Sequence, residues 1–297
     1  MNQRGRTGRE DVNNYRDYTQ EELDRQYNVR LGIPDFQAFF DRFAAAGQAA
    51  RARHPHLADV AYGEHALQTW DFFPAANNGR PLLVFIHGGY WRSLDKHQFS
   101  HLALPYLAAD INVALLNYRL APEVRMGSIA ADCGFALRQL CSKAGALGFD
   151  AQAVWLMGHS AGAHLATLIA ALGAAPVRGV CGISGLYDLE PVRLSYLNEI
   201  LHLSPGDAAQ ASPILRPLPP GMDALLCVGG LESDEFHRQQ DSYAACLRQS
   251  EHAVRVVAAP QAHHLSIIDV AADPASPLTR AMLDLIDKSS GASARTR

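Results

Sequence analysis

The chain carries a series of apolar runs that alternate with helical patterns, and this alternation limits the fold more than any other feature. Six runs stand out: PLLVFIH (81–87), INVALLNY (111–118), AVWLMG (153–158), VRGVCGIS (177–184), ALLCVGG (224–230) and AVRVVAAP (253–260). Consecutive apolar positions are typical of strands that are buried on both faces of a parallel sheet. Helical spacing of apolar residues lies between them, over 96–109, 128–146, 161–173, 235–250 and 276–288. The pattern predicts an α/β fold, with a mostly parallel central sheet and helices on both faces.

The remaining sequence favours a single domain around this sheet. The 297 residues suit one large α/β domain, which we place at 21–288 because no linker interrupts that range. Residues 1–20 are expected to form a flexible leader, and residues 289–297 a disordered tail. The stretch 185–221 is rich in Pro, Leu and Ser and breaks the alternation, which predicts a small cap-like insertion. Phenylalanines at helical spacing in 35–53 predict an N-terminal helix that packs by that face.

Composition excludes several classes of partner. The net charge is −4 and no basic stripe is present, which argues against nucleic acid as a partner. No apolar run reaches the roughly 18 residues that span a bilayer, so no membrane association is expected. Arginines near the start are not followed by an apolar segment of the kind found in export signals, so we expect a cytoplasmic protein. A small-molecule substrate is the expected partner, and the sequence leaves a homodimer open.

The cysteines and histidines do not follow metal-site or disulfide patterns. The five cysteines are odd in number and widely spaced, without a CxxC, which favours reduced thiols. The 13 histidines include no HExxH and no paired Cys/His spacing. We therefore expect neither a metal nor another cofactor.

The first chemical motif is Gly158-His159-Ser160-Ala161-Gly162. On its own a GxSxG match is weak, but here an apolar strand precedes it and a strong helix-forming run follows it. That setting is the sharp strand-to-helix turn that exposes a nucleophilic serine at the edge of an α/β-hydrolase sheet. The motif therefore predicts an α/β-hydrolase fold with Ser160 as the nucleophile.

The second motif is His87-Gly88-Gly89-Tyr90-Trp91, directly after the run 81–86. Acyl transfer builds negative charge on the carbonyl oxygen of the substrate, and backbone N–H groups stabilise that charge. Glycines allow the main chain to approach the substrate closely. The expected donors are the N–H groups of Gly89 and Tyr90, together with that of Ala161 after the nucleophile. Gly88 is expected to contact the substrate.

A base and an acid should follow the serine in the order Ser, Asp/Glu, His. His263 and His264 follow the final predicted strand, and we choose His264 because the apolar segment LSIIDVA anchors it, with His263 as the alternate. Glu232 is the first acid after the run 224–230, so we prefer it over Asp234, which could instead cap the next helix. Its carboxylate would orient the imidazole and stabilise its charged form.

Several longer segments together resemble one family. HGGYW, GHSAGAHLA, SGLYDLEP, LESDEFHRQ and HHLSIIDVAADPASPLTRAML look like those of the kynurenine formamidase (arylformamidase) branch of the α/β-hydrolases, and the resemblance runs from about 26 to 288. YRLAP is also similar to the wider hormone-sensitive-lipase-like group, which usually has a third glycine where Tyr90 stands. Relatives often carry aspartate at the position of Glu232.

The resemblance implies metal-independent hydrolysis of an aryl formamide such as N-formyl-kynurenine, or of a related amide or ester. It implies Ser160 as the nucleophile, His264 as the base and Glu232 as the acid. Aromatic side chains of Tyr90, Trp91 and Tyr187 either form a wall for a planar substrate or pack in the interior. Two rival functions are a general carboxylesterase or amidase for another small acyl group, and a ligand-binding protein without catalysis on the same fold.

Overall fold

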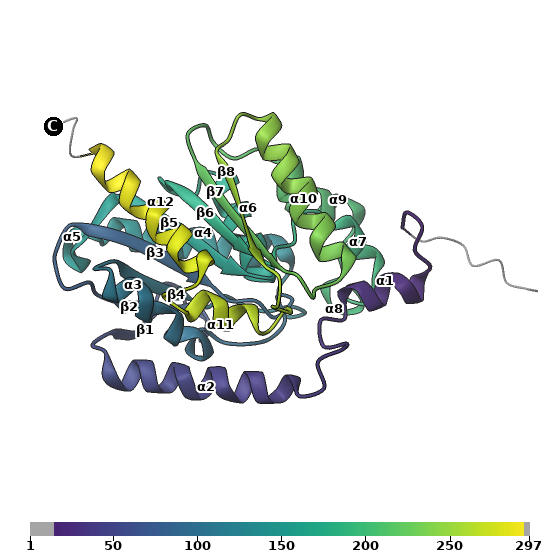
Figure 1. Ribbon diagram of the computed structural model, residues 1–297, viewed down its shortest axis with the longest axis horizontal. Helices are drawn as coiled ribbons and strands as arrows, with labels where there is room; N and C mark the ends of the chain where they lie inside the picture. Colours follow the sequence, from purple (N-terminus) through teal and green to yellow (C-terminus); the bar gives the residue numbers. More distant parts are fainter. Residues whose placement is uncertain (1–14, 294–297) are drawn as a thin grey trace, which may run out of the picture.

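The computed structural model describes residues 15–293 and is built on one eight-stranded sheet (Figure 1). The strands are β1 (Leu57–Ala61), β2 (Thr69–Phe73), β3 (Arg80–Ile86), β4 (Asn112–Leu116), β5 (Phe149–His159), β6 (Gly179–Ile183), β7 (Asp223–Gly229) and β8 (Val254–Ala259). Their spatial order is β1-β2-β4-β3-β5-β6-β7-β8. The pairs β1/β2 and β2/β4 are antiparallel and all later pairs are parallel. The predicted mostly parallel sheet is confirmed.

Alternation along each strand divides the apolar residues between two cores. On β3, Leu82, Val84 and Ile86 belong to one apolar cluster, whereas Leu83 and Phe85 belong to the other. All five side chains are at most 1% exposed. Successive side chains on a strand point to opposite faces, so an unbroken apolar run fits a sheet that is covered on both sides.

Helices cover the two faces. The first cluster includes residues of α4 (Met126–Ser142), α6 (Ala161–Ala171) and α10 (Asp234–Gln249). The second includes residues of η1 (Lys96–Ala103), α3 (Leu104–Ala108), α11 (Ile267–Ala272) and α12 (Pro277–Ser293). The short helix α5 (Ala144–Leu147) leads into β5. These layers confirm the predicted α/β-hydrolase fold. The expected helix 96–109 differs, since its first part is a 3₁₀ helix.

Two helices precede the sheet, α1 (Gln20–Tyr27) and α2 (Phe36–Arg53), and only the second was predicted. On α2, Phe43 is buried, and Gly47 allows close contact with η1 because a Cβ there would lie 2.1 Å from the carbonyl oxygen of His97. Helix α1 begins with a Thr19/Glu22 capping box, in which each side chain accepts a backbone N–H at the helix start.

The insertion between β6 and β7 forms α7 (Glu190–Leu194), α8 (Asn198–Leu201), α9 (Pro205–Ala211) and η2 (Pro213–Leu215). Figure 1 shows α1 beside α7 and α8 at one end of the sheet, and α1 contacts both α7 and α10. This insertion is the predicted cap at 185–221.

The chain ends differ from the expected boundaries. Helix α12 continues to Ser293, five residues past the expected end of the last helix at 288, so part of the expected tail is helical. Of the expected leader and tail, residues 1–14 and 294–297 lie outside the described residues. Among the described residues, no helix is both long and apolar enough to cross a bilayer.

Candidate active site

Ser160 sits on the sharp turn between β5 and α6. Its φ is +56°, in the left-handed region, and its N–H donates to the carbonyl oxygen of Ile183 on β6 at 2.8 Å. The glycines on either side are required by space. A Cβ on Gly158 would lie 2.2 Å from the carbonyl oxygen of Gly162, and a Cβ on Gly162 would lie 2.0 Å from that of Ile86. The turn therefore tolerates only glycine at these two positions and fixes the serine at the strand end.

His264, in the loop between β8 and α11, faces this serine. Its Nε2 lies 3.0 Å from Oγ of Ser160, and its Nδ1 lies 2.6 Å from Oε2 of Glu232. His159 anchors the loop, because its Nε2 hydrogen-bonds to the carbonyl oxygen of His264 at 2.9 Å. Burial lowers the pKa of His159 well below its ordinary range, so this ring is neutral and donates through Nε2.

The alternate base, His263, does not face the serine. Its ring packs against Phe39 of α2, with the ring centroids 4.9 Å apart. Its Nδ1 accepts the backbone N–H groups of Leu265 and Ser266, each at 3.2 Å. His263 therefore caps the turn before α11, and its pKa is lowered, first of all by burial.

Glu232 is held so that one oxygen faces the imidazole. Its Oε1 accepts the N–H of Gly229 at 2.8 Å and the hydroxyl of Ser184 at 2.5 Å, while Oε2 faces His264. Its side chain is only 1% exposed. The alternative acid, Asp234, is exposed in the first turn of α10. The structure thus brings Ser160, His264 and Glu232 together and leaves Asp234 apart.

The loop after β3 lies against the serine. Gly89, Tyr90 and Trp91 all have positive φ, at +100°, +49° and +57°. A Cβ on Gly88 would lie 3.0 Å from the Cβ of Ser160, so this glycine permits the close approach of the loop. Within residues 15–293, no acceptor takes the backbone N–H of Gly89, Tyr90 or Ala161. These are the three predicted donors, and their free N–H groups suit an oxygen that gains negative charge.

A cavity of about 660 Å³ opens on Ser160 and His264. Aromatic side chains on its wall come from α2, the loop after β3 and the cap: Phe36, Phe40, Tyr90 and Tyr196. Two guanidinium groups, those of Arg30 and Arg92, also line it. Of the described residues that line it, none carries a carboxylate, so the cavity is suited to an aromatic molecule with a negative group.

Three residues expected at the substrate do not line this cavity, and the expectation for them is corrected. Trp91 is fully buried, and its Nε1–H donates to Nδ1 of His164 at 3.1 Å. Tyr187 is 1% exposed and stacks on Tyr243 with the ring centroids 4.2 Å apart. Gly88 packs closely against His159 and Ser160. Both aromatic rings follow the packing alternative, because their positions point into the interior.

The lining residues that sequence reasoning missed come from α2, from the segment 28–30, from the cap, from the segment 92–94 and from Ala121-Pro122. The helical spacing of the phenylalanines in 35–53 predicted that they pack in the interior. Of these, Phe43 is fully buried, whereas Phe36 and Phe40 line the cavity. Nothing local in the sequence links Tyr196 to Ser160. Only the three-dimensional placement of the cap brings that ring to the cavity wall.

One cluster outside this site has donor atoms of a metal site. Oxygens of Asp59 and Asp71 and a ring nitrogen of His97 lie within 4.8 Å of one another. The buried ammonium of Lys96 already lies between the two carboxylates, 2.5 Å from Asp59 Oδ1 and 3.0 Å from Asp71 Oδ1. Lys96 thereby supplies the positive charge that these acids need.

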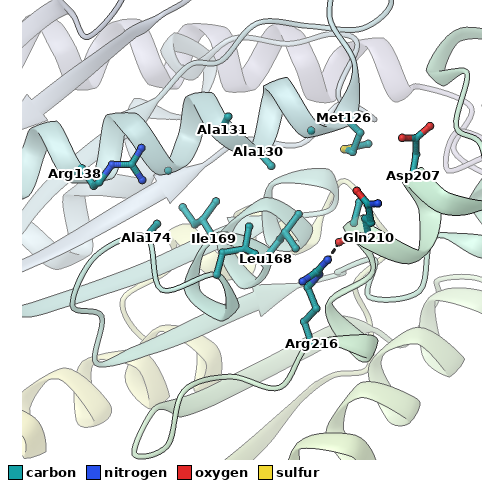
Figure 2. Close-up of a pocket in the computed structure, with 14 residues that line it drawn as sticks. Met126, Ala130, Ala131, Arg138, Leu168, Ile169, Ala174, Asp207, Gln210 and Arg216 are labelled. Carbon is teal, nitrogen blue, oxygen red and sulfur yellow. Dashed lines mark hydrogen bonds between the residues drawn. The ribbon is translucent and has the colours of Figure 1, made fainter.

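A second cavity, of about 420 Å³, lies between α4, α6 and α9 (Figure 2). Its floor is apolar, formed by residues such as Ala130 and Ile169, and Arg138 and Arg216 stand at its rim. Ser160 and His264 are not among its lining residues. Ser160 and His264 therefore line the first cavity and not this one.

Comparisons with known proteins agree with this fold. A family model described as BD-FAE matches residues 72–182. The kynurenine formamidase of Danio rerio is 27% identical over 94% of this chain and 100% of its own length. A solved structure of a candidate thioesterase from Silicibacter sp. TM1040 has a TM-score of 0.79 and 28% identity, covering 90% of this chain and 99% of that one. A thermostable carboxylesterase cloned from a metagenomic library shares the fold, with a TM-score of 0.67 and 21% identity, over 92% of this chain and 96% of its own.

Proposed function

Because the chain is a kynurenine formamidase-like α/β-hydrolase, and thus an enzyme of amide or ester hydrolysis, we propose that it is a serine hydrolase of small aryl formamides. The observation that carries the proposal is the continuous contact from Ser160 through His264 to Glu232. Nucleophile, base and orienting acid lie within hydrogen-bond reach of one another, as acyl transfer requires.

The proposed reaction has two halves. Ser160 Oγ attacks the carbonyl carbon while Nε2 of His264 takes its proton, and Glu232 stabilises the resulting imidazolium. The N–H groups of Gly89, Tyr90 and Ala161 stabilise the oxyanion, and each such donor contributes about 2.7–4 kcal/mol in comparable enzymes. His264 then protonates the leaving amine or alcohol, the bond to it breaks, and an acyl-serine ester remains.

In the second half, water replaces the leaving group. His264 takes a proton from the water as its oxygen attacks the acyl-serine carbonyl. The tetrahedral intermediate then collapses, the serine oxygen regains the proton from His264, and the carboxylic acid leaves. For a formamide substrate that acid is formic acid. No group other than these side chains, backbone donors and water is needed for the balance.

The cavity supports an aryl substrate. Rings of Phe36, Phe40 and Tyr196 offer apolar surface, and the guanidinium groups of Arg30 and Arg92 offer two positive charges. N-formyl-kynurenine joins an aryl formamide to a free carboxylate, which suits both features. A pocket of this kind discriminates one methylene by only about 1–3 kcal/mol, so acetyl analogues should also react, more slowly.

A second candidate is a general carboxylesterase or amidase, which the likeness to solved esterases favours. p-Nitrophenyl esters of increasing acyl length separate the two, because an aryl formamidase should be fastest on the shortest acyl groups. A third candidate is a ligand-binding protein without turnover. The complete set of Ser160, His264 and Glu232 argues against it. A cytoplasmic location for the enzyme stays a prediction.

The test measures hydrolysis of N-formyl-kynurenine and p-nitrophenyl acetate by the wild-type protein and by Ser160→Ala. We expect turnover of at least one substrate and a fall in kcat of about 10⁶-fold in the variant, as for serine knockouts in comparable enzymes. A ligand-binding protein would keep its affinity in Ser160→Ala and show no turnover in either form. Folded wild-type protein that is inactive on both substrates would refute the proposal.

A further inference from the structure

We propose that the segment 20–36, here named the N-terminal clasp, positions the oxyanion donor of this site through a hydrogen bond from Tyr90 to Tyr27. The inference rests on the proposed function, because it concerns the backbone N–H of Tyr90. The clasp comprises α1 and the turn that leads to α2, and it precedes the sheet in the chain. Tyr27 does not line the cavity that opens on Ser160 and His264, so it acts by positioning, whereas Arg30 and Phe36 at the other end of the clasp line that cavity.

The backbone of Tyr90 requires support from its surroundings. The φ angles of Tyr90 (+49°) and Trp91 (+57°) lie in the left-handed region, which residues other than glycine rarely adopt. Such conformations persist only where neighbouring contacts fix them. The phenolic hydroxyl of Tyr90 donates to the carbonyl oxygen of Tyr27 at 2.7 Å. The bond is buried, because Tyr90 is 7% exposed and Tyr27 is fully buried. This bond ties the strained loop to the clasp.

The accepting carbonyl is held in place. Tyr27 is the last residue of α1, and its carbonyl oxygen also accepts the backbone N–H of Val29 at 3.1 Å. Its side chain is fixed at the far end, since its hydroxyl donates to Oε2 of Glu235 at 2.9 Å and accepts from Gln239 at 3.2 Å. Its ring packs on Phe236, which also packs on His264, with centroid distances of 6.1 and 4.7 Å. The acceptor is thus fixed to α10, the helix that follows Glu232.

The same clasp joins the other loops of the site. The hydroxyl of Ser233, beside Glu232, donates to the carbonyl oxygen of Gln26 at 2.7 Å. In the cap, the N–H of Tyr196 donates to Asp24 at 2.7 Å, and its hydroxyl lies 3.4 Å from the carbonyl oxygen of Tyr27. One short helix therefore connects the loops that carry the proposed donor, the proposed acid and a wall of the cavity.

Tyr90→Phe tests the inference, because it removes one hydroxyl and keeps the ring. We expect kcat to fall about three- to tenfold with little change in KM, the factor that corresponds to the loss of one net hydrogen bond. Affinity for an aryl trifluoromethyl ketone, which forms a tetrahedral oxyanion on serine, should weaken by the same factor. A merely structural role would not move kcat and this affinity together while KM stays constant.

Two matched variants complete the experiment. Tyr106→Phe removes another buried hydroxyl, whose one hydrogen-bond partner within residues 15–293 is Sδ of Met157 at 3.5 Å, and should leave kcat, KM and ketone affinity unchanged. Ser233→Ala loosens the clasp and leaves Tyr90 intact, so kcat should fall in the same direction by a smaller factor. If Tyr90→Phe does not fold, Ser233→Ala alone tests the positioning role of the clasp.

The outcomes separate the two proposals. If wild-type protein turns over substrate but Tyr90→Phe and Ser233→Ala keep kcat and ketone affinity within twofold of it, the clasp has no positioning role. If Tyr106→Phe loses as much as Tyr90→Phe, the loss reflects general destabilisation and the inference is refuted. If wild-type protein neither turns over substrate nor binds the ketone, the proposed function fails and the inference fails with it.

Discussion

Replacing Glu232 by glutamine tests how the structure orients the base. In the wild-type protein Oε1 of Glu232 is occupied by the N–H of Gly229 and the hydroxyl of Ser184, so only Oε2 faces the imidazole. A glutamine carbonyl would take the position of Oε1, because it must accept from Gly229. Its NH₂ group would then face Nδ1 of His264. That nitrogen would have to become the acceptor, and the proton would move to Nε2.

The consequence is a base in the wrong tautomer. With a proton on Nε2, the imidazole cannot take the proton of Ser160, whose Oγ lies 3.0 Å away. The same change of acid to amide in a well-studied serine protease lowers kcat by about 10⁴-fold, which corresponds to roughly 5 kcal/mol. We expect a loss of this size in Glu232→Gln, with KM nearly unchanged because the side chain is buried away from the cavity.

The assay follows p-nitrophenyl acetate hydrolysis by the wild-type protein, Glu232→Gln and the control Asp234→Asn, each checked for folding by circular dichroism. Asp234 is exposed at the start of α10, so its amide variant should match the wild type within about twofold. If Glu232→Gln keeps more than a tenth of wild-type kcat, or if Asp234→Asn loses more than Glu232→Gln, the assignment of the acid is wrong.

Three further predictions follow from packing, charge and burial. Gly162→Ala should lower the free energy of unfolding by about 1–3 kcal/mol or more, because its Cβ would lie 2.0 Å from a backbone oxygen of β3; an unchanged urea midpoint would contradict this. Arg30→Gln and Arg92→Gln should each raise KM for N-formyl-kynurenine about three- to tenfold and leave KM for formanilide, which has no carboxylate, unchanged; equal effects on both substrates would refute the anion role. Burial lowers the pKa values of His101 and His164 to about 4, whereas both rings titrate near pH 6.5 in the unfolded chain. Between about pH 4 and pH 6.5 the unfolded chain therefore binds more protons than the folded protein. The free energy of unfolding should therefore fall as pH drops from about 6.5 to 4, by roughly 1.4 kcal/mol per pH unit for each histidine; urea unfolding at pH 7, 6 and 5 measures it, and a flat or rising profile would be inconsistent with buried neutral rings.

The fold was predictable because its signals are local. The run 81–86 is apolar at every position and the run 224–230 contains no charged or polar side chain, and the sheet is covered on both faces, so the pattern predicts one structure. The turn at Ser160 was also predictable, because a Cβ on Gly158 or Gly162 would clash with backbone atoms and both positions therefore require glycine. Secondary structure and the elbow depend on neighbouring residues, which a sequence displays directly.

The cavity wall was not predictable in the same way. Phe40 and Tyr196 reach the cavity from segments more than 35 residues away from Ser160 on either side, and no periodicity encodes that approach. Trp91 and Tyr187 follow motif residues closely, yet both rings point into the interior, where Trp91 finds His164 and Tyr187 finds Tyr243. Adjacency in sequence fixes where a backbone lies, but packing decides which way a large side chain points.

The assignment of Ser160 is tested most directly by a fluorophosphonate probe, which reacts with activated serine hydroxyls, followed by mass spectrometry of the digested protein. One adduct per chain is predicted on the peptide that contains Ser160, and it should disappear in Ser160→Ala and slow greatly in His264→Ala. A protein that hydrolyses its substrate while the adduct forms on another residue, such as Ser93 of the same cavity wall, would contradict this account.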